Sequence, residues 1–331
     1  MQAPPLLEVR GLRTEIAGPG GRFAAVDDVS FEVARGERLA IVGESGSGKT
    51  LTALSILRLL PDPPARIAAG EIRFGGRDLA ALPAAKMRAV RGREIAMIFQ
   101  EPMTSLNPVF TVGNQIREIL ALHRGLRGRA ARARATELLE LVNIPSPARR
   151  LDSYPHELSG GTRQRVMIAM ALASEPKLLI ADEPTTALDV TVQSQLLDLL
   201  LRLQSELGMA IILITHDLGV VAEFAERVLV MYAGGIVEEG PVDTIFASPR
   251  HPYTAGLLGS IPPIDRDVDE LATIEGTVPP PGAALPGCRF QPRCTFARPA
   301  CGRRLPPLLP FGLGHHARCI RWIDYAVGET A

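Results

Sequence analysis

The sequence Gly43-Glu44-Ser45-Gly46-Ser47-Gly48-Lys49-Thr50 decides the fold of this chain. It follows an apolar run at residues 38–42 and precedes a helical pattern over residues 49–60. The spacing matches G-x-x-x-x-G-K-[ST], a strand–loop–helix motif whose glycines let backbone N–H groups converge on phosphate oxygens. Lys49 is suited to neutralise the β- and γ-phosphates, and the Thr50 hydroxyl is suited to bind Mg²⁺. We therefore expect this loop to bind a nucleoside triphosphate.

Other apolar runs predict the sheet to which this loop belongs. Runs with the length of buried parallel strands lie at residues 95–99, 178–181, 211–215 and 228–232. Helical patterns separate them, which indicates an α/β core. Ligands of open parallel sheets bind beyond the carboxyl ends of the strands. The polar or small residues that follow the strands are Gly43, Gln100, Asp182 and His216.

Two adjacent carboxylates, Asp182 and Glu183, follow the run at residues 178–181. Asp182 is suited to hold Mg²⁺, and Glu183 is suited to polarise an attacking water as general base. Alone, the pair would fit a strand followed by a solvated turn. Together with the phosphate loop, it predicts nucleotide hydrolysis.

A second anion-binding motif, Leu158-Ser159-Gly160-Gly161-Thr162, opens a helical stretch over residues 163–173. A serine with backbone N–H groups at a helix N-terminus suits an anion. Two such motifs in one chain resemble the ATP-binding-cassette (ABC) ATPases, whose signature is L-S-G-G-Q. Thr162 stands in place of the glutamine. The resemblance implies a head-to-tail dimer in which Ser159, Gly160 and Gly161 close on the nucleotide of the other subunit.

The remaining ABC motifs follow in order. The resemblance implies that Gln100 is a lid glutamine that senses Mg²⁺, the water and the membrane partner. It also implies that Asp189 belongs to a loop that crosses the dimer interface, and that His216 contacts the γ-phosphate. The family stacks adenine on an aromatic residue of the first hairpin. Ile16 aligns with that position and Phe23 lies across the turn, so both stay open.

Longer segments resemble one subfamily, the ATPases of bacterial di- and oligopeptide importers. These segments are residues 100–108, 154–161, 163–170, 181–192 and 251–254. The resemblance implies the first of two different ATPases, hence a heterodimer, together with two membrane permeases and an extracytoplasmic substrate-binding protein. Nickel and glutathione importers share this subunit type, so they stay open as alternatives to peptides.

The resemblance implies a P-loop ABC ATPase domain at residues 1–250 and a C-terminal extension at residues 251–331. The first has an N-terminal antiparallel β-subdomain and an inserted helical subdomain at about residues 101–174. The extension holds 12 of the 28 prolines and has too little periodicity to bury a core alone. The extension is therefore either loosely draped over the main domain or held in place by a cross-link. We expect the phosphate loop to lie in a core that folds separately from the extension.

All the cysteines lie in this extension, at Cys288, Cys294, Cys301 and Cys319. Their spacing lacks the C-x2-C knuckles of common zinc modules. Four thiolates in such a segment could carry a [4Fe–4S] cluster. The subfamily has that cluster at matching positions, so the resemblance implies it here. Zinc, with His315 or His316, and free thiols are the alternatives.

Composition and hydropathy further limit the class of protein to which the chain can belong. Acidic and basic residues balance at 36 each, which does not favour nucleic acid as a partner. No run reaches the ~18 apolar residues of a membrane span, and no signal peptide is indicated. We expect a peripheral protein on the cytoplasmic face of the cell (inner) membrane.

Two rival classes are less well supported. The first is a soluble ABC ATPase of DNA repair or translation. Against it, the chain has one set of ABC motifs and not two tandem cassettes. The 58 residues between Gln100 and Ser159 are also too few for a long coiled-coil insertion. An iron–sulfur redox sensor that uses ATP only as a ligand is opposed by Glu183, which argues for turnover.

Overall fold

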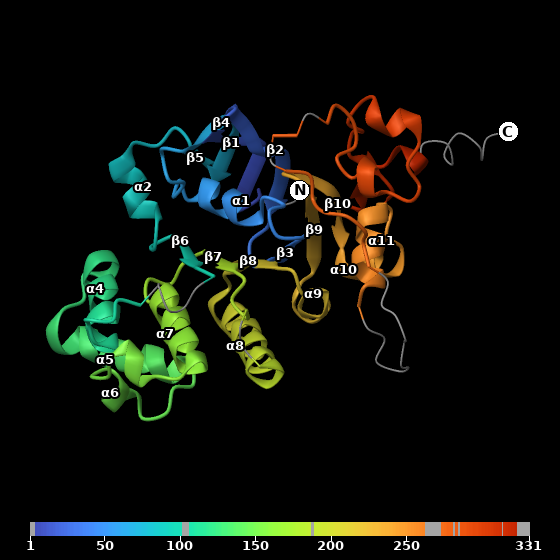
Figure 1. Cartoon of the computed structure of the whole chain (residues 1–331). Helices are drawn as coiled ribbons and strands as arrows, with labels where there is room; N and C mark the ends of the chain where they lie inside the picture. Colours follow the sequence, from blue (N-terminus) through green and yellow to red (C-terminus); the bar gives the residue numbers. More distant parts are fainter. Residues whose placement is uncertain are drawn as a thin grey trace. The chain divides into compact units, whose positions relative to one another are not determined.

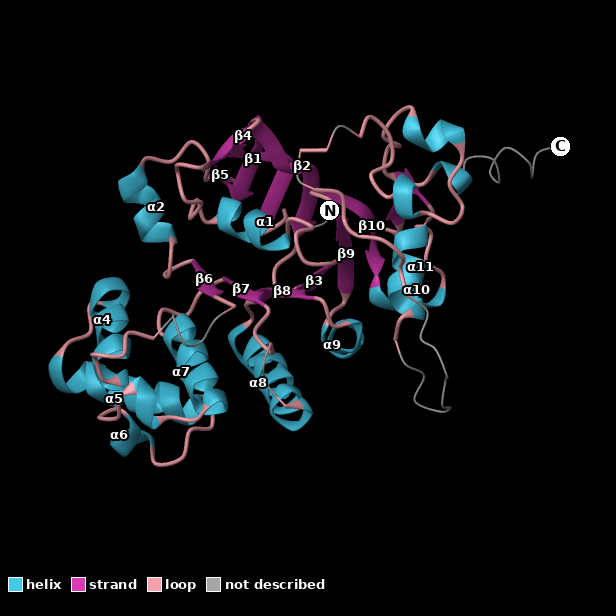
Figure 2. Ribbon diagram, viewed as in Figure 1, coloured by secondary structure: helices cyan, strands magenta, loops and turns pink. Residues whose placement is uncertain are grey.

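The computed structural model describes residues 4–100, 106–186, 189–261, 273–280, 282–283, 285–312 and 314–322. The chain divides into two compact units. The loop unit, which contains the phosphate loop, comprises Met1–Val33, Arg38–Ala80 and Thr215–Ala331. The helical unit comprises Ala34–Glu37 and Ala81–Ile214. Both contain strands and helices (Figures 1 and 2).

The loop unit begins with an antiparallel hairpin of β1 (Leu7–Gly18) and β2 (Gly21–Val33). Gly18 pairs with Gly21 across a two-residue turn, and the positive φ of Gly21 (111°) explains a glycine there. On its other edge, β1 pairs with β4 (Ala65–Phe74), which pairs with β5 (Arg77–Asp78). This four-stranded sheet confirms the predicted antiparallel β-subdomain. Register shifts between Val9 and Glu15 interrupt the pairing of β1 with β2.

A second set of strands in the loop unit supports the phosphate loop. The strand β3 (Arg38–Val42) lies parallel to β9 (Arg227–Tyr232), which pairs antiparallel with β10 (Gly235–Pro241). The strands β3 and β9 are apolar and buried beyond their first residues, as expected for the centre of a sheet. The helices of this unit are α1 (Lys49–Ile56), α9 (Leu218–Phe224), α10 (Val242–Ala247) and α11 (Pro252–Gly259).

The C-terminal extension is built into the loop unit. Its strand β12 (His316–Ala317) pairs antiparallel with β10, and β11 (Leu309–Pro310) pairs with β12. Short 3₁₀ turns at Gln291–Arg293, Pro299–Gly302 and Ile320–Trp322 connect the rest. The extension is therefore not loosely draped, because it belongs to the same compact unit as the phosphate loop. The expectation that the phosphate loop folds separately from it stays a prediction.

Aromatic and ionic contacts hold the extension in place. Phe290 is buried, and its ring centroid lies 5.2 Å from that of Tyr232 in β9 and 5.4 Å from that of Tyr253 in α11. Glu238 of β10 is fully buried, and its carboxylate lies 2.7 Å from Nε2 of His315 and accepts a hydrogen bond from the backbone N–H of His251. Removing one partner from such a buried network typically costs about 3–5 kcal/mol.

The helical unit contains three parallel strands in the order β8 (Ala210–Thr215), β7 (Leu178–Asp182), β6 (Ile95–Ile98). Its helices are α2 (Ala84–Val90), α4 (Val112–Arg124), α5 (Gly128–Leu141), α6 (Pro147–Arg150), α7 (Gly160–Leu172) and α8 (Val190–Leu207). Within the described residues from 106 to 174, all regular structure is helical, and α4, α5 and α7 contact one another. None of the described helices is long and apolar enough to cross a membrane.

The buried His251 makes the stability of the loop unit sensitive to acid. Its Nδ1 accepts the Tyr253 N–H at the start of α11, and burial lowers its pKa from about 6.5 to about 3. The unfolded chain therefore binds a proton that the folded chain excludes, so stability is lost as the pH falls below about 6.5. At pH 5.5 this loss is about 1.4 kcal/mol.

We expect His251→Asn, which keeps a side-chain acceptor but does not titrate, to remove this term. Between pH 7.5 and 5.5, the free energy of unfolding of the wild-type chain should fall about 1.4 kcal/mol further than that of the variant, as measured by urea unfolding. An equal fall in both proteins would contradict this account.

Candidate functional site

The phosphate loop joins the end of β3 to the start of α1, and two of its glycines are sterically required. Gly43 has a φ of 151°, and a Cβ atom there would lie 2.2 Å from the carbonyl oxygen of Met231. Gly48, the N-cap of α1, has a φ of 102°, and its Cβ would lie 3.0 Å from the carbonyl oxygen of Ala25. Any other residue would force the loop away from the strands that support it.

The side chains of the loop suit a phosphate ligand. Lys49 is buried, and its ammonium donates to the carbonyl oxygens of Gly43 (2.7 Å) and Glu44 (3.0 Å). The Ser47 hydroxyl is buried and has no hydrogen-bond partner among the described residues. Thr50 is exposed in the first turn of α1. An unpaired buried hydroxyl, an ammonium within the loop and a helix N-terminus together fit a magnesium-bound triphosphate.

In the helical unit, Asp182 ends β7 and is buried, and Glu183 follows it directly. The Glu183 carboxylate accepts hydrogen bonds from Nε2 of Gln100 (3.0 Å) and from the hydroxyl of Thr186 (2.9 Å). The structure thus brings together two of the predicted catalytic residues, Gln100 and Glu183. Thr186 is an addition that the sequence did not single out.

The backbone of Glu183 is strained. Its φ of 46° lies in the left-handed region, which costs a non-glycine residue about 1–2 kcal/mol. The conformation is held by the hydrogen bond from its N–H to the carbonyl oxygen of Ile214 (2.8 Å). Strain of this kind is concentrated at active sites, where the surrounding structure fixes a side chain for chemistry.

The signature motif begins α7. The Ser159 hydroxyl accepts from the backbone N–H of Thr162 and lies 2.9 Å from the Thr162 hydroxyl, so the residue that replaces glutamine supports the cap. A Cβ atom on Gly161 would lie 3.2 Å from Val192 of α8. Asp189 caps α8 by accepting from the Val192 N–H. The N-termini of α7 and α8, with their capping residues, therefore lie side by side. Residues 187–188, which belong to the predicted interface loop with Asp189, lie outside the described residues.

Gln164 of α7 is a further residue that sequence reasoning missed. It is buried, and its Nε2 donates to the carbonyl oxygen of Pro184 at 2.6 Å. It ties the signature helix to the turn that carries Glu183. Glutamine in a helical pattern carries no chemical signal of its own, so only the structure could reveal this contact.

His216 follows β8 directly and is exposed. Its neighbour Asp217 caps α9 by accepting from the backbone N–H of Gly219 (2.8 Å). The two adenine-stacking candidates, Ile16 and Phe23, are paired across the first hairpin, and both are half-buried. A Cβ atom on Gly282 of the extension would lie 2.9 Å from Cβ of Phe23, so the extension lies against that side chain.

The four cysteines of the extension line one cavity of about 20 Å³, and none forms a disulfide. Burial raises the pKa of the Cys288 thiol to about 11 and also raises the pKa values of Cys294 and Cys319, with the other cysteines adding to each shift. Among the described residues, no group of three or more His, Cys, Asp or Glu side chains could hold a metal ion.

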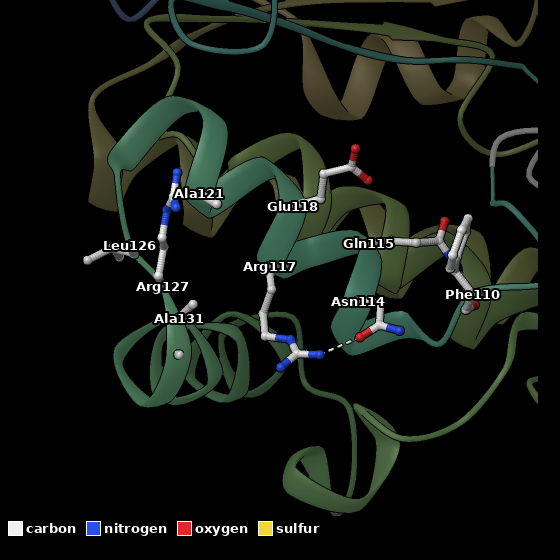
Figure 3. A pocket seen from close by; sticks show the side chains of 10 residues that line it. Phe110, Asn114, Gln115, Arg117, Glu118, Ala121, Leu126, Arg127 and Ala131 are labelled. Carbon is white, nitrogen blue, oxygen red and sulfur yellow. Dashed lines mark hydrogen bonds between the residues drawn. The ribbon is translucent and has the colours of Figure 1, made fainter.

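A larger cavity, of about 340 Å³, lies in the helical unit along α4 and the start of α5 (Figure 3). Phe110 borders it and is half exposed, and Arg117 is held over it by a hydrogen bond to Asn114. Val109 and Leu122, which do not line the cavity, are 70% and 76% exposed.

Comparisons with known proteins identify the family. Residues 26–186 match the ABC transporter family, and residues 237–301 match the C-terminal region of oligopeptide/dipeptide transporters. A Brucella abortus (strain 2308) protein, assigned by its name to ATP binding in peptide import, is 56% identical over 319 residues, which cover 96% of each chain. A similarly named protein of Brucella melitensis biotype 1 is 53% identical over 98% of this chain and 100% of the relative.

Solved structures agree with this assignment. The ATP-binding cassette MJ0796, in a dimeric post-hydrolysis state bound to ADP and Pi, has a TM-score of 0.64 at 28% identity, over 71% of this chain and 98% of its own. The cbiO1 protein of Clostridium perfringens, part of the ABC transporter complex cbiONQ, has a TM-score of 0.63 at 29% identity, over 74% of this chain and 92% of its own.

The chain belongs to the ABC transporter family, as an ATP-binding, ATP-hydrolysing subunit. The predicted P-loop ABC ATPase fold is confirmed. The predicted resemblance to the di-/oligopeptide subfamily is confirmed as well, because a model of its C-terminal region matches this extension.

We expect Glu183→Gln to bind Mg-ATP but to hydrolyse it about 10²–10⁴-fold more slowly, since the amide cannot accept a proton from water. Steady-state turnover and nucleotide affinity of the purified chain separate these two effects. The control is Glu175→Gln, which changes an exposed glutamate paired with Arg124 on the same unit. Turnover within a few-fold of the wild-type value in Glu183→Gln would remove this residue from the reaction.

Proposed function

We propose that this chain powers the import of di- and oligopeptides through a membrane ABC transporter. The observation that carries the proposal is the Glu183 carboxylate, held by Gln100 and Thr186 at the end of a buried strand in a chain that also has a phosphate loop. The peptide-import names of relatives that match almost the whole chain support the choice of cargo. Nickel or glutathione import by the same subunit type is the alternative.

The proposed roles follow the chemistry of each side chain. Glu183 takes the proton of the attacking water, while His216 and Gln100 orient the water and the γ-phosphate. Mg²⁺ would be held by Thr50, Asp182 and Gln100, and would supply positive charge that offsets the charge of the phosphates. The phosphates themselves bind to the loop residues Gly43, Glu44, Ser45, Gly46, Ser47, Gly48, Lys49 and Thr50.

We propose that two ATPase subunits close head to tail around the nucleotides. Ser159 is exposed at the N-terminus of α7, as an anion-binding group requires. With Gly160, Gly161 and Asp189 of the adjoining α8 N-terminus, it would contact the nucleotide held by the other subunit. The proposed partner is a second, different ATPase.

The proposed membrane partners are two permease subunits, which receive peptides from an extracytoplasmic binding protein. The cavity beside α4, with the exposed Phe110, fits an apolar side chain of a permease helix. The chain would thus be peripheral, on the cytoplasmic face of the inner membrane. We further propose that the ATPase domain ends near residue 250, with its helical subdomain at about residues 101–174, and that residues 251–331 form the extension.

The function can be tested in the reconstituted transporter with Ser159→Arg, which places a bulky cation at the dimer contact. The variant should bind Mg-ATP on its own loop, but peptide-stimulated hydrolysis and peptide uptake should fall at least about 10-fold. Arg163→Ala, also on α7, is the control, since its side chain donates to Pro155. Stimulation by nickel chelates or glutathione, and not by peptides, would overturn the assigned cargo.

We also propose that Cys288, Cys294, Cys301 and Cys319 hold a [4Fe–4S] cluster. The proposal is supported by the number and chemistry of the thiols, since four free cysteines line one cavity. As the described side chains stand, they form no group that could hold a metal ion. The cavity has room for about one water, so the lining side chains would have to move apart to accept a cluster. When bound, the group would cross-link a segment with little regular structure and replace the thiol protons.

Anaerobically purified protein should contain about four iron and four sulfide per chain. Cys294→Ser should lose them, and the segment after residue 285 should become more sensitive to proteolysis. Thr295→Ala, a change at the exposed neighbouring residue, should retain the iron. Elemental analysis decides: stoichiometric zinc without iron would favour a zinc site, and protein without metal would leave free thiols.

A further inference from the structure

The C-terminal extension reaches the phosphate loop directly, through Arg293 and Glu44. One Arg293 nitrogen, Nη1, donates to both carboxylate oxygens of Glu44, at 2.9 and 3.0 Å. Glu44 is the second residue of the phosphate loop, and Arg293 precedes Cys294. We propose that Arg293 is a positioning residue for ATP binding, which holds the phosphate loop in its binding shape through Glu44. The inference rests on the proposed binding of ATP phosphates by residues 43–50.

The extension fixes the guanidinium of Arg293 in one orientation. Its Nε donates to the carbonyl oxygen of Glu275 (2.9 Å), and its Nη2 donates to that of Ile274 (3.1 Å). The group lies 5.8 Å from the ring centroid of Tyr232 and 6.0 Å from that of Phe290. Only 6% of the side chain is exposed. The extension engages Nε and Nη2, while Nη1 donates to both Glu44 oxygens and, at 3.4 Å, to the Tyr232 hydroxyl. The extension thus sets where the Glu44 carboxylate lies.

A second residue of the extension holds the backbone of Glu44. The hydroxyl of Tyr253, in α11, accepts the Glu44 N–H at 2.9 Å. Tyr253 is fully buried, and burial raises its pKa, so the phenol stays protonated at neutral pH. The Glu44 N–H is therefore directed to α11, and both the side chain and the backbone of this loop residue are fixed by the extension.

A third residue of the extension, Arg289, supports the phosphate loop through the peptide unit between Ala233 and Gly234. The backbone N–H of Gly234 donates to the carbonyl oxygen of Ser47 (2.9 Å). The preceding carbonyl, that of Ala233, accepts from Nη1 of Arg289 (2.7 Å), and Arg289 also pairs with Asp27. The extension thus supports the phosphate loop near its beginning and near its end.

These contacts act on affinity rather than on the chemical step. A loop that is ordered before ATP arrives loses less conformational freedom on binding, which improves affinity without touching the reacting atoms. Arg293→Ala should therefore weaken binding of a non-hydrolysable Mg-ATP analogue by roughly 3- to 10-fold. The KM for ATP should rise by a similar factor, while kcat stays within about twofold of the wild-type value.

The test is isothermal titration calorimetry on the full-length chain with the Mg²⁺ complex of the analogue. Glu44→Gln, which leaves the extension intact, should weaken binding as Arg293→Ala does, and the double variant should be no weaker than the weaker single variant. Arg293→Lys should recover part of the affinity, since lysine keeps the positive charge but lacks the planar guanidinium with its several fixed donors. The control is Arg318→Ala, which removes an arginine of the extension whose hydrogen bonds go to Ile236, Pro306 and Asp28, outside the phosphate loop.

The possible outcomes separate the two claims. Wild-type affinity in Glu44→Gln and in a folded Arg293→Ala, or additive losses in the double variant, would overturn the role of Arg293. An equal loss in Arg318→Ala would also overturn it, because any disturbance of the extension would then suffice. Lys49→Ala tests the proposed function itself: if it binds the analogue as the wild-type chain does, the loop is not the phosphate site.

Discussion

Gly43 passes so close to the Met231 carbonyl oxygen that a Cβ atom would lie 2.2 Å from it, and the loop unit depends on this approach. It places the first residue of the phosphate loop directly against β9. The next residue of β9, Tyr232, contacts Phe290 and Tyr253 of the extension. One strand therefore supports the nucleotide loop and the extension together. A change in the packing of either side would be transmitted through a strand whose residues are almost completely buried.

The chemistry depends on a different kind of constraint. Glu183 adopts a left-handed backbone and is held by bonds from Gln100 and Thr186 and to Ile214. Ser159 and Asp189 present two capped helix N-termini side by side in the same unit. The phosphate loop and the strained Glu183 carboxylate thus belong to separately compact parts of the chain.

The features that could be predicted from the sequence are those in which a residue type has one main physical role. The glycines of the phosphate loop, the apolar strands and the Asp-Glu pair are such cases, because steric room, burial and charge are local properties. Sequence reasoning could not foresee Arg293 and Tyr253, since their partner Glu44 lies more than 200 residues away in the chain. It also judged the extension by its prolines and weak periodicity, whereas two short edge strands and three aromatic rings integrate it into the loop unit. Gln164 was missed for a related reason: its carbonyl partner on Pro184 is a feature of the backbone path.

The phosphate loop and the C-terminal extension should therefore respond to nucleotide as one unit. Amide hydrogen exchange of the full-length chain, with and without Mg-nucleotide, tests it most directly. The account predicts that nucleotide slows exchange in residues 43–50 and also in residues 252–259 and 288–294, which no nucleotide atom needs to touch. Slower exchange confined to the phosphate loop and α1, with the extension unchanged, would contradict it.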